Sequence, residues 1–224
     1  MHAILRVRIP DGKVTTVTDP PSLRERKKRA TREALQAAAL RLALEHGPEN
    51  VRVEDIAEAA GVSTRTYNNY FSSREQAIVA AIAADRAAQV AAAVTSRPAD
   101  IRLGDAVTDA IVGLYTDSDG PHDALLMIAT SPTLRASYVD TATTIEGPLA
   151  EAITRRCQGI ETLTAQVLAA GVGAAVKVAL RQWLQSTYAT PSMPGFVIPS
   201  GPLPDLLRAA LTPLAPALNA RMTP

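Results

Sequence analysis

The chain has 224 residues, of which 47% are hydrophobic and 4% aromatic, with a single cysteine. This length allows one large or two modest domains, and the Ala-rich composition favours helices over sheet. One cysteine excludes an internal disulfide framework, so we expect a reducing, cytoplasmic location. No apolar run reaches the roughly 18 residues that a membrane span needs, and the first ten residues lack a signal peptide. We therefore expect an all-α protein with no membrane partner.

The net charge of +1 divides unevenly along the chain. Residues 1–74 carry 13 Lys and Arg against 9 Asp and Glu, whereas residues 75–224 carry 10 against 13. A basic front end on a slightly acidic body suits a protein that contacts a polyanion with one end only. Chance clustering could produce the same imbalance, so charge alone decides nothing.

Residues 1–21 are expected to form a flexible arm. Apolar and polar residues alternate around Pro10-Asp-Gly-Lys13, which also fits a small hairpin with a turn at that point. An isolated two-stranded ribbon is marginal in water, and nothing identifies a partner, so we favour the arm.

From Ser22 the pattern becomes helical. Ser22 and Glu25 are spaced as a capping box, and Gly47-Pro48 predicts the end of the helix after His46. The apolar face comprises Leu35, Ala38, Ala39, Leu42 and Ala43. The first turns carry Arg24, Arg26, Lys27, Lys28, Arg29 and Arg32. Cations are unfavourable near a helix N-terminus, and a bound phosphate would relieve this, although a solvated or disordered helix end is the alternative.

The most informative segment is residues 53–71, which reads as two short helices hinged at Gly61. Glycine can leave the right-handed region without a Cβ penalty, so it ends the first helix, and Ser63 can cap the second. The second helix combines hydrogen-bonding side chains with Tyr67 and Phe71, which are spaced four apart for packing. This is the pattern of a helix-turn-helix whose second helix enters a DNA major groove.

The remaining chain is predicted to be helical. We expect a long helix from the cap at Ser72-Ser73 to about Thr95, with Ile78, Ile82 and Val90 buried. Further helices are expected over about 101–117, 122–130, 132–157, 160–188 and 202–219. The proline-rich stretch 190–204 predicts a loop.

Residues 24–80 resemble the DNA-binding domain of TetR-family transcriptional regulators. The resemblance rests on the basic first helix, Val53-Glu-Asp-Ile-Ala-Glu-Ala-Ala-Gly-Val-Ser63, Tyr67-Asn-Asn-Tyr-Phe71 and Ser73-Arg-Glu75. It implies an N-terminal three-helix helix-turn-helix domain at 22–72. It also implies a C-terminal helical effector-binding and dimerisation domain at 73–224.

The same resemblance implies roles for individual residues. Thr64, Arg65 and Asn69 correspond to positions that approach base edges, and Arg65 is our first choice for specificity because Arg can fork onto guanine. The remaining candidates for DNA contact are Thr66, Asn68, Tyr70, Arg74, Lys27 and Lys28. Thr66 could instead pack or cap. Arg52-Val53, where many members have a Thr cap, and Asn68, where a phosphate-binding Tyr is common, depart from the family pattern.

The second half also resembles the regulators associated with mycofactocin gene clusters and their acyl-CoA-responsive relatives. The resemblance rests on residues 124–135 and 149–156. It implies a largely apolar effector such as a fatty acyl-CoA, with an aromatic drug-like effector as the alternative.

The family resemblance places a pocket among helices four to seven and a dimer interface on the last two helices. Pocket candidates are Ile111, Leu114, Tyr115, Leu126, Met127, Leu134 and Tyr138, with Arg135, Arg155 and Arg156 as partners for an acidic head group. Dimer-interface candidates are Leu163, Val167, Ala170, Gly171, Ala174 and Val178. Plain core packing and solvated surface charge are the alternatives for both sets.

Catalysis finds little support in the sequence. Three histidines and Cys157 are scattered without metal-ligand spacing, and no phosphate-binding glycine motif occurs. We expect no catalytic residues, no metal and no cofactor. The expected function is a ligand-responsive, homodimeric repressor that binds double-stranded operator DNA and responds to a small-molecule effector. A helical ligand-binding module that no longer binds DNA is the competing hypothesis.

Overall fold

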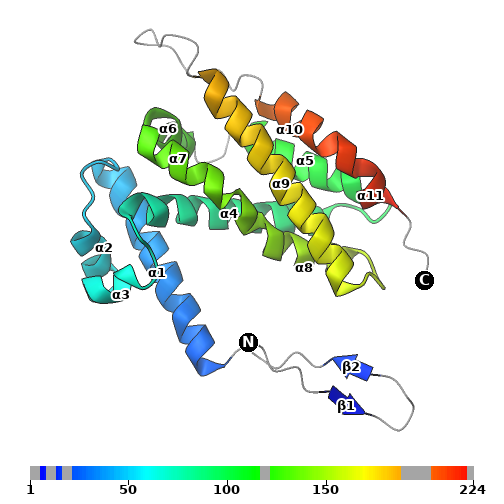
Figure 1. The fold of residues 1–224 in the computed structure, drawn as a ribbon, viewed down its shortest axis with the longest axis horizontal. Coiled ribbons are helices and arrows are strands. Elements are labelled where there is room, and N and C mark those ends of the chain that lie inside the picture. Colours follow the sequence, from blue (N-terminus) through cyan, green and yellow to red (C-terminus); the bar gives the residue numbers. More distant parts are fainter. Residues whose placement is uncertain (1–5, 9–13, 17–21, 117–121, 188–202, 221–224) are drawn as a thin grey trace.

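The structure is a computed structural model that describes residues 6–8, 14–16, 22–116, 122–187 and 203–220. Within these residues the only strands are β1 (Arg6–Arg8) and β2 (Val14–Thr16), which pair antiparallel with Val7 opposite Thr15. This pairing matches the hairpin alternative, while the proposed turn at Pro10–Lys13 lies outside the described residues. The body is helical throughout, which confirms the predicted all-α fold (Figure 1).

The N-terminal domain contains α1 (Leu23–His46), α2 (Val53–Ala59) and α3 (Thr64–Asn68). The capping box at the start of α1 is confirmed: the Ser22 hydroxyl accepts from the Glu25 N–H at 3.2 Å, and the Glu25 carboxylate accepts from the Ser22 N–H at 2.8 Å. At the other end Gly47 has φ 82°, which a side chain would make unfavourable. Four of the five predicted apolar residues of α1 are buried, and Leu42 is partly buried.

The helix α4 (Arg74–Ser96) connects the N-terminal domain to the body. It packs against α1 at one end. Along the rest of its length it packs against α5 (Leu103–Thr116), α7 (Pro132–Asp140), the 3₁₀ turn η1 (Thr141–Ile145) and α8 (Glu146–Arg156). Figure 1 shows it running through the middle of the body. Eleven of its side chains are buried, including the predicted Ile78, Ile82 and Val90, so α4 is the central helix of the core.

The rest of the body is built around α4. Its elements are α5 (Leu103–Thr116), α6 (His122–Thr130), α7 (Pro132–Asp140), η1 (Thr141–Ile145), α8 (Glu146–Arg156), α9 (Thr162–Thr187), α10 (Leu203–Leu211), η2 (Thr212–Leu214) and α11 (Ala215–Asn219). The C-terminal pair α10 and α11 lies against α5, where the Asn219 side chain accepts a 2.7 Å hydrogen bond from the Gly104 N–H. The predicted loop at 190–204 falls almost wholly outside the described residues.

The expectation of one helix over 132–157 is wrong. A 3₁₀ turn at Thr141–Ile145 separates α7 from α8. Three threonines and an isoleucine occupy this turn, and β-branched side chains weaken an α-helix. The turn packs on both α4 and α9, so it redirects the chain inside the core.

Among the described residues, two helices are long and apolar enough to cross a membrane, although the sequence contains no uninterrupted apolar run of that length. These are α4 and the Thr162–Leu184 part of α9. More than half of the α4 window is buried inside the protein, and core helices of water-soluble proteins pass the same test of length and composition.

Candidate nucleic-acid interface and buried cavity

The turn between α2 and α3 has the predicted geometry. Gly61 has φ 67°, and the next N–H, that of Val62, donates to the Ala57 carbonyl at 2.9 Å. The Ser63 hydroxyl caps α3 by accepting from the Thr66 N–H at 3.2 Å, and it also lies 2.9 Å from the Thr66 hydroxyl. Thr66 therefore takes part in the cap, which was the alternative to a DNA contact.

The inward face of α3 is fixed by two aromatic side chains. Tyr67 and Phe71 are 0% and 1% exposed, which confirms that they belong to the core. The Tyr67 hydroxyl donates to the Ser73 carbonyl at 2.8 Å, at the start of α4. Burial, with the nearby Glu75 carboxylate, raises the pKa of Tyr67 to about 12, so this donor keeps its proton. The orientation of α3 is thereby coupled to that of α4.

The outward face of α3 presents hydrogen-bonding side chains. Arg65, Asn68 and Asn69 are exposed, while Thr64 and Tyr70 are half-buried. This arrangement suits the roles given to them, which stay predictions. Tyr70 packs partly against the core, so only part of its side chain is exposed.

Basic side chains line the first half of α1. Lys27 and Lys28 are exposed there, as are their arginine neighbours. Two of these arginines have protein partners: Arg29 pairs with Glu33 at 3.5 Å, and the Arg32 guanidinium lies 4.9 Å from the centre of the Phe71 ring. Arg32 thus packs on the core of the DNA-binding domain.

Arg74 has partners within the protein. Its Nη1 donates to the Glu49 carbonyl at 2.9 Å and to the Val51 carbonyl at 2.8 Å, and its Nε donates to Glu75 at 2.8 Å. The guanidinium therefore ties the start of α4 to the segment between α1 and α2. This geometry assigns Arg74 a structural position, with only Nη2 left for the predicted phosphate contact.

At Arg52 the departure from the family pattern has a visible consequence. The Arg52 side chain makes no capping hydrogen bond to α2, although Asp55 accepts from the Arg52 N–H at 3.3 Å. One half of a capping box is thus present and the other is absent.

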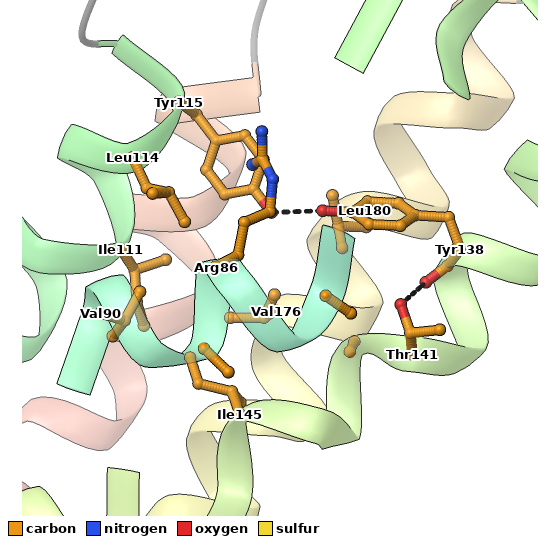
Figure 2. A pocket seen from close by; sticks show the side chains of 13 residues that line it. Arg86, Val90, Ile111, Leu114, Tyr115, Tyr138, Thr141, Ile145, Val176 and Leu180 are labelled. Atoms are coloured by element: carbon orange, nitrogen blue, oxygen red, sulfur yellow. Dashed lines mark hydrogen bonds between the residues drawn. The ribbon is translucent and has the colours of Figure 1, made fainter. Parts of the chain in front are cut away.

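A cavity of about 40 Å³ lies in the body, beside α4. Its lining comes from α4, α5, α7, η1 and α9 (Figure 2). The lining residues are Ala83, Arg86, Ala87, Val90, Ile111, Leu114, Tyr115, Tyr138, Thr141, Ala142, Ile145, Val176 and Leu180. Apart from Arg86, two tyrosines and one threonine, this surface is apolar, and its volume is enough for only a few water molecules.

Arg86 is the charged residue among the lining residues that the sequence analysis did not predict. Its side chain is 7% exposed, and its guanidinium lies 4.7 Å from the centre of the Tyr115 ring. The signal was present in the sequence, because Arg86 falls midway between the buried Ile82 and Val90 at spacings of four. A charged residue in the middle of an apolar stripe indicates a polar site inside the core.

Two tyrosine hydroxyls form the polar rim of this cavity. The Tyr115 and Tyr138 hydroxyls lie 3.3 Å apart, as Figure 2 shows. Burial raises the pKa of Tyr138 well above its usual value, and Tyr115 adds to that effect. Burial acts to lower the pKa of the Arg86 guanidinium, but Tyr138 and Tyr115 outweigh it, so the net shift is upward. Near neutral pH the cavity thus holds the Arg86 cation beside the protonated hydroxyl of Tyr138.

Half of the predicted pocket residues line this cavity. Ile111, Leu114, Tyr115 and Tyr138 do so. Leu126 does not, because it lies on the outer face of α6 with 52% exposure. Met127 and Leu134 are buried in the core outside the cavity lining, and the half-buried Arg135 is also absent from it.

Neither arginine near the end of α8 lines the cavity beside α4. The Arg156 guanidinium donates to the carbonyl of Val94 in α4 and to those of Arg97, Pro98 and Ile101 between α4 and α5, at 2.6–3.3 Å. Arg155 lies on the surface, 3.6 Å from Glu151. Arg156 therefore fastens the end of α4 to α8, and Arg155 is a solvated surface group.

The half-buried Cys157 directly follows α8. Burial raises the pKa of its thiol against the opposing effect of Arg156. The described residues contain no group of three His, Cys, Asp or Glu side chains that could hold a metal ion.

An apolar stripe lies open on α9. Leu163, Val167 and Val178 are 69%, 61% and 56% exposed, and Ala170 and Ala174 between them are also exposed. Gly171 is half-buried and faces Leu214, which a Cβ would meet at 3.7 Å. Five of the six interface candidates thus lie on the outer surface, where packing within one subunit does not explain them.

Two family models match the chain, one for each domain. Residues 35–82 match the model described as bacterial regulatory proteins of the tetR family. Residues 101–219, about half of the chain, match the model described as the MftR C-terminal domain. The chain belongs to the TetR family. This confirms both resemblances seen in the sequence.

A curated relative agrees with this assignment. The chain is 36% identical over 151 residues to the HTH-type transcriptional regulator TcmR of Streptomyces glaucescens, a match that covers 63% of this chain and 66% of that protein. This chain is therefore a TetR-family transcriptional regulator, and proteins of this family are in general DNA-binding, ligand-responsive repressors that are not enzymes.

Several solved structures are loosely similar to this chain. A TetR-family regulator from Streptomyces coelicolor A3 is 18% identical, with 89% of this chain and 98% of that chain covered and a TM-score of 0.42. RolR in complex with resorcinol is 19% identical over 89% of this chain and 97% of its own, with a TM-score of 0.44. FadR of Thermus thermophilus in complex with lauroyl-CoA is 18% identical over 86% and 97%, with a TM-score of 0.39. Likeness this loose does not transfer a ligand.

Proposed function

We propose that this TetR-family regulator is a homodimeric repressor that leaves its operator when a small, largely apolar effector enters the cavity beside α4. The observation that carries this proposal is that α4 connects the DNA-binding domain to the cavity. One end of that helix holds the DNA-reading helix through Tyr67 and Ser73, and its middle supplies Arg86 to the cavity.

Contacts to DNA come from α3 and α1. Arg65 and Asn69 on α3 read base edges, because Arg suits guanine and Asn suits adenine in the major groove. Lys27 and Lys28 on α1 contact phosphates and supply affinity without sequence preference. The support is their exposure on one domain, together with the burial of Tyr67 and Phe71 behind them.

Dimerisation uses the exposed stripe of α9. The apolar side chains of Leu163, Val167 and Val178 are exposed to solvent in the single subunit, and an apolar patch of this kind marks an interaction surface. The small residues between them allow two helices to approach closely. A two-fold dimer places one reading helix in each of two major grooves, about one helical turn or roughly 34–36 Å apart. The operator is therefore expected to be nearly palindromic.

Effector binding changes the spacing of the two reading helices. The cavity holds about 40 Å³, so any effector larger than a few water molecules must push its walls apart. Since α4 forms one of those walls and is clamped to the DNA-binding domain through Arg74, displacement of α4 moves that domain. The effector must prefer the displaced conformer, because equal affinity for both would shift nothing.

A fatty acyl-CoA is the effector implied by the sequence resemblance, and an aromatic compound is the alternative. The apolar lining suits either one, and the Tyr115 and Tyr138 rings also suit an aromatic partner. Thermal unfolding with acyl-CoA esters and with aromatic compounds separates the two. If no acyl-CoA raises the melting temperature, the acyl-CoA prediction is wrong.

Selection of bound fragments from the source genome tests the DNA-binding function. The repressor hypothesis predicts enrichment of a two-fold symmetric sequence, retarded on gels by the purified chain and less so as salt rises. The competing ligand-binding module predicts no enriched sequence and no retardation at low salt. Genes next to an enriched fragment would also narrow the choice of effector.

A further inference from the structure

Arg86 is a buried cation that the protein does not fully satisfy. Its Nε and Nη1 atoms are covered from solvent and have no hydrogen-bond partner among the described residues. Its recorded partners are the face of the Tyr115 ring and the Tyr115 and Tyr138 hydroxyls, which are close enough to shift its pKa. Two of its three nitrogens are therefore left without acceptors.

Among the described residues, no lining residue compensates the charge of Arg86. Arg86 is the one charged residue of that described lining, and burial raises the pKa of Tyr138 well above its usual value, so Tyr138 brings no negative charge at pH 7. The neighbouring Asp85 is exposed, and its carboxylate accepts from Gln89 at 2.7 Å. Burying a charge without a counter-charge and without hydrogen bonds is costly, and it persists where something else repays that cost.

The surroundings of Arg86 indicate what a partner must look like. Any partner has to lie against the aliphatic surface made by Val90, Ile111 and Ile145, so most of it must be apolar. It must also bring acceptor oxygens to the guanidinium, and an anionic oxygen provides both the hydrogen bond and the missing charge. The planar fork of Arg matches both carboxylates and phosphates, and the small apolar cavity favours the smaller, singly charged carboxylate.

We propose that the effector is a compact apolar carboxylic acid, bound as its anion, whose carboxylate pairs with Arg86. This inference rests on the proposed function, since it names the chemical class of the effector for the same cavity. It differs from an acyl-CoA, because the thioester that replaces the acid is neutral and brings no charge to Arg86. Since Nε and Nη1 are covered in the ligand-free conformer, the acid pairs with them only as the cavity widens.

The position of Arg86 gives this pairing a direct effect on DNA binding. Arg86 lies in the middle of α4, the helix that also carries the Arg74 clamp. The guanidinium stacks on Tyr115 of α5 in the ligand-free protein. A carboxylate that draws it away from Tyr115 loosens the contact between α4 and α5 at the centre of the body.

Matched ligand pairs test the proposal. The full-length chain is titrated with octanoate, octanamide and octanoyl-CoA, and with 2-naphthoate and 2-naphthamide, with melting temperature and operator release as readouts. The variants are Arg86→Met, Arg86→Lys and, as a control, Arg102→Met, which removes an exposed arginine of the α4–α5 segment that pairs with Asp105. Operator binding without ligand reports on the proposed function independently of the choice of acid.

We expect at least one acid to bind ten or more times more tightly than its amide, which has the same shape but no charge. This preference should disappear in Arg86→Met, remain in Arg86→Lys in weaker form, and stay unchanged in Arg102→Met. Equal binding of acid and amide, tighter binding of octanoyl-CoA than octanoate, or no binding by either acid would each overturn the proposal. If the ligand-free wild-type chain does not bind operator DNA, the repressor function is contradicted instead.

Stability of the ligand-free protein separates an anion site from a structural brace. If the charge of Arg86 is uncompensated, Arg86→Met keeps or raises the melting temperature of the ligand-free chain, because the aliphatic side chain suits the apolar surroundings. If Arg86 serves only to hold α4 against Tyr115, the same variant lowers the melting temperature and leaves the acid preference intact. That pair of results would refute the inference.

Discussion

At the scale of single residues, the chain separates side chains that face DNA from side chains that hold the helices in place. Tyr67 and Phe71 are in the core while Arg65 and Asn69 are exposed, as their spacing predicts. Arg74 is the instructive exception. The family resemblance implies a phosphate contact for Arg74, which stays a prediction for its Nη2. Its Nη1 donates to the carbonyls of Glu49 and Val51, a tertiary contact that no local pattern encodes.

Arg65→Ala should weaken operator binding by about 1–3 kcal/mol and relax specificity at one base pair of each half-site. Lys27→Ala provides the comparison, because a phosphate contact carries no sequence information. Lys27→Ala should lower the affinity for all DNA sequences alike, and it should reduce by about one the slope of log affinity against log salt concentration. Competition binding with single-base operator variants distinguishes the two. An Arg65→Ala protein with unchanged specificity would show that Arg65 does not read bases.

The pair Arg74–Glu75 should make stability depend on pH. Burial acts to raise the pKa of Glu75, but hydrogen bonds from Arg74, from its own N–H and from Ser73 prevail and lower it. A carboxyl whose folded pKa is lowered stabilises the fold above its unfolded value of about 4.3, and this contribution is lost as pH falls through the folded pKa. Glu75→Gln should therefore melt lower than wild type at pH 7, and the two melting curves should converge toward pH 3. A constant difference across this range would exclude the linkage.

At the scale of elements, the sequence predicts where the helices lie and most of their caps. It does not predict the break between α7 and α8. Ser22, Ser63 and Gly61 act as their residue types predict, because capping and positive φ are local properties. The turn at Thr141–Ile145 contains no Gly or Pro, so its packing against α4 and α9, and not a local turn signal, determines where the helix breaks. A run of β-branched residues was the one local sign of that break.

Arg156 should stabilise the junction of α4, α5 and α8. Arg156→Met removes donors from four backbone carbonyls, which are partly exposed, so we expect a loss of about 1–3 kcal/mol. Arg155→Met is the matched control, because its ion pair with Glu151 is solvated and contributes little. Urea unfolding measures both. Equal effects of the two variants would mean that the four contacts do not hold α4.

At the scale of the whole molecule, the helical periodicity of apolar residues predicts the architecture but does not predict the cavity. The periodicity of α4 predicts its buried stripe, yet the meaning of Arg86 within that stripe appears only when α5 and α7 bring Tyr115 and Tyr138 to it. Leu126 fails as a pocket residue for the same reason, since the face that α6 presents to the core depends on its neighbours. Assembly and DNA binding belong to this scale.

Val167→Glu should break the dimer. The substitution places a charge in the middle of the exposed stripe of α9, where two copies would bring like charges together. Sedimentation should show a monomer in place of a dimer, and operator affinity should fall because only one half-site is held at a time. Ala88→Glu, on the outer side of α4, is the control and should remain dimeric. A Val167→Glu protein that sediments as a dimer would move the interface elsewhere.

The most direct measurement is the affinity of the purified chain for its selected genomic fragment as salt concentration is varied. A dimeric repressor should bind a two-fold symmetric site with one dimer per site, and the logarithm of its affinity should fall linearly with the logarithm of salt concentration. Absence of any selected fragment, or equal affinity for that fragment and for scrambled DNA at every salt concentration, would contradict the account.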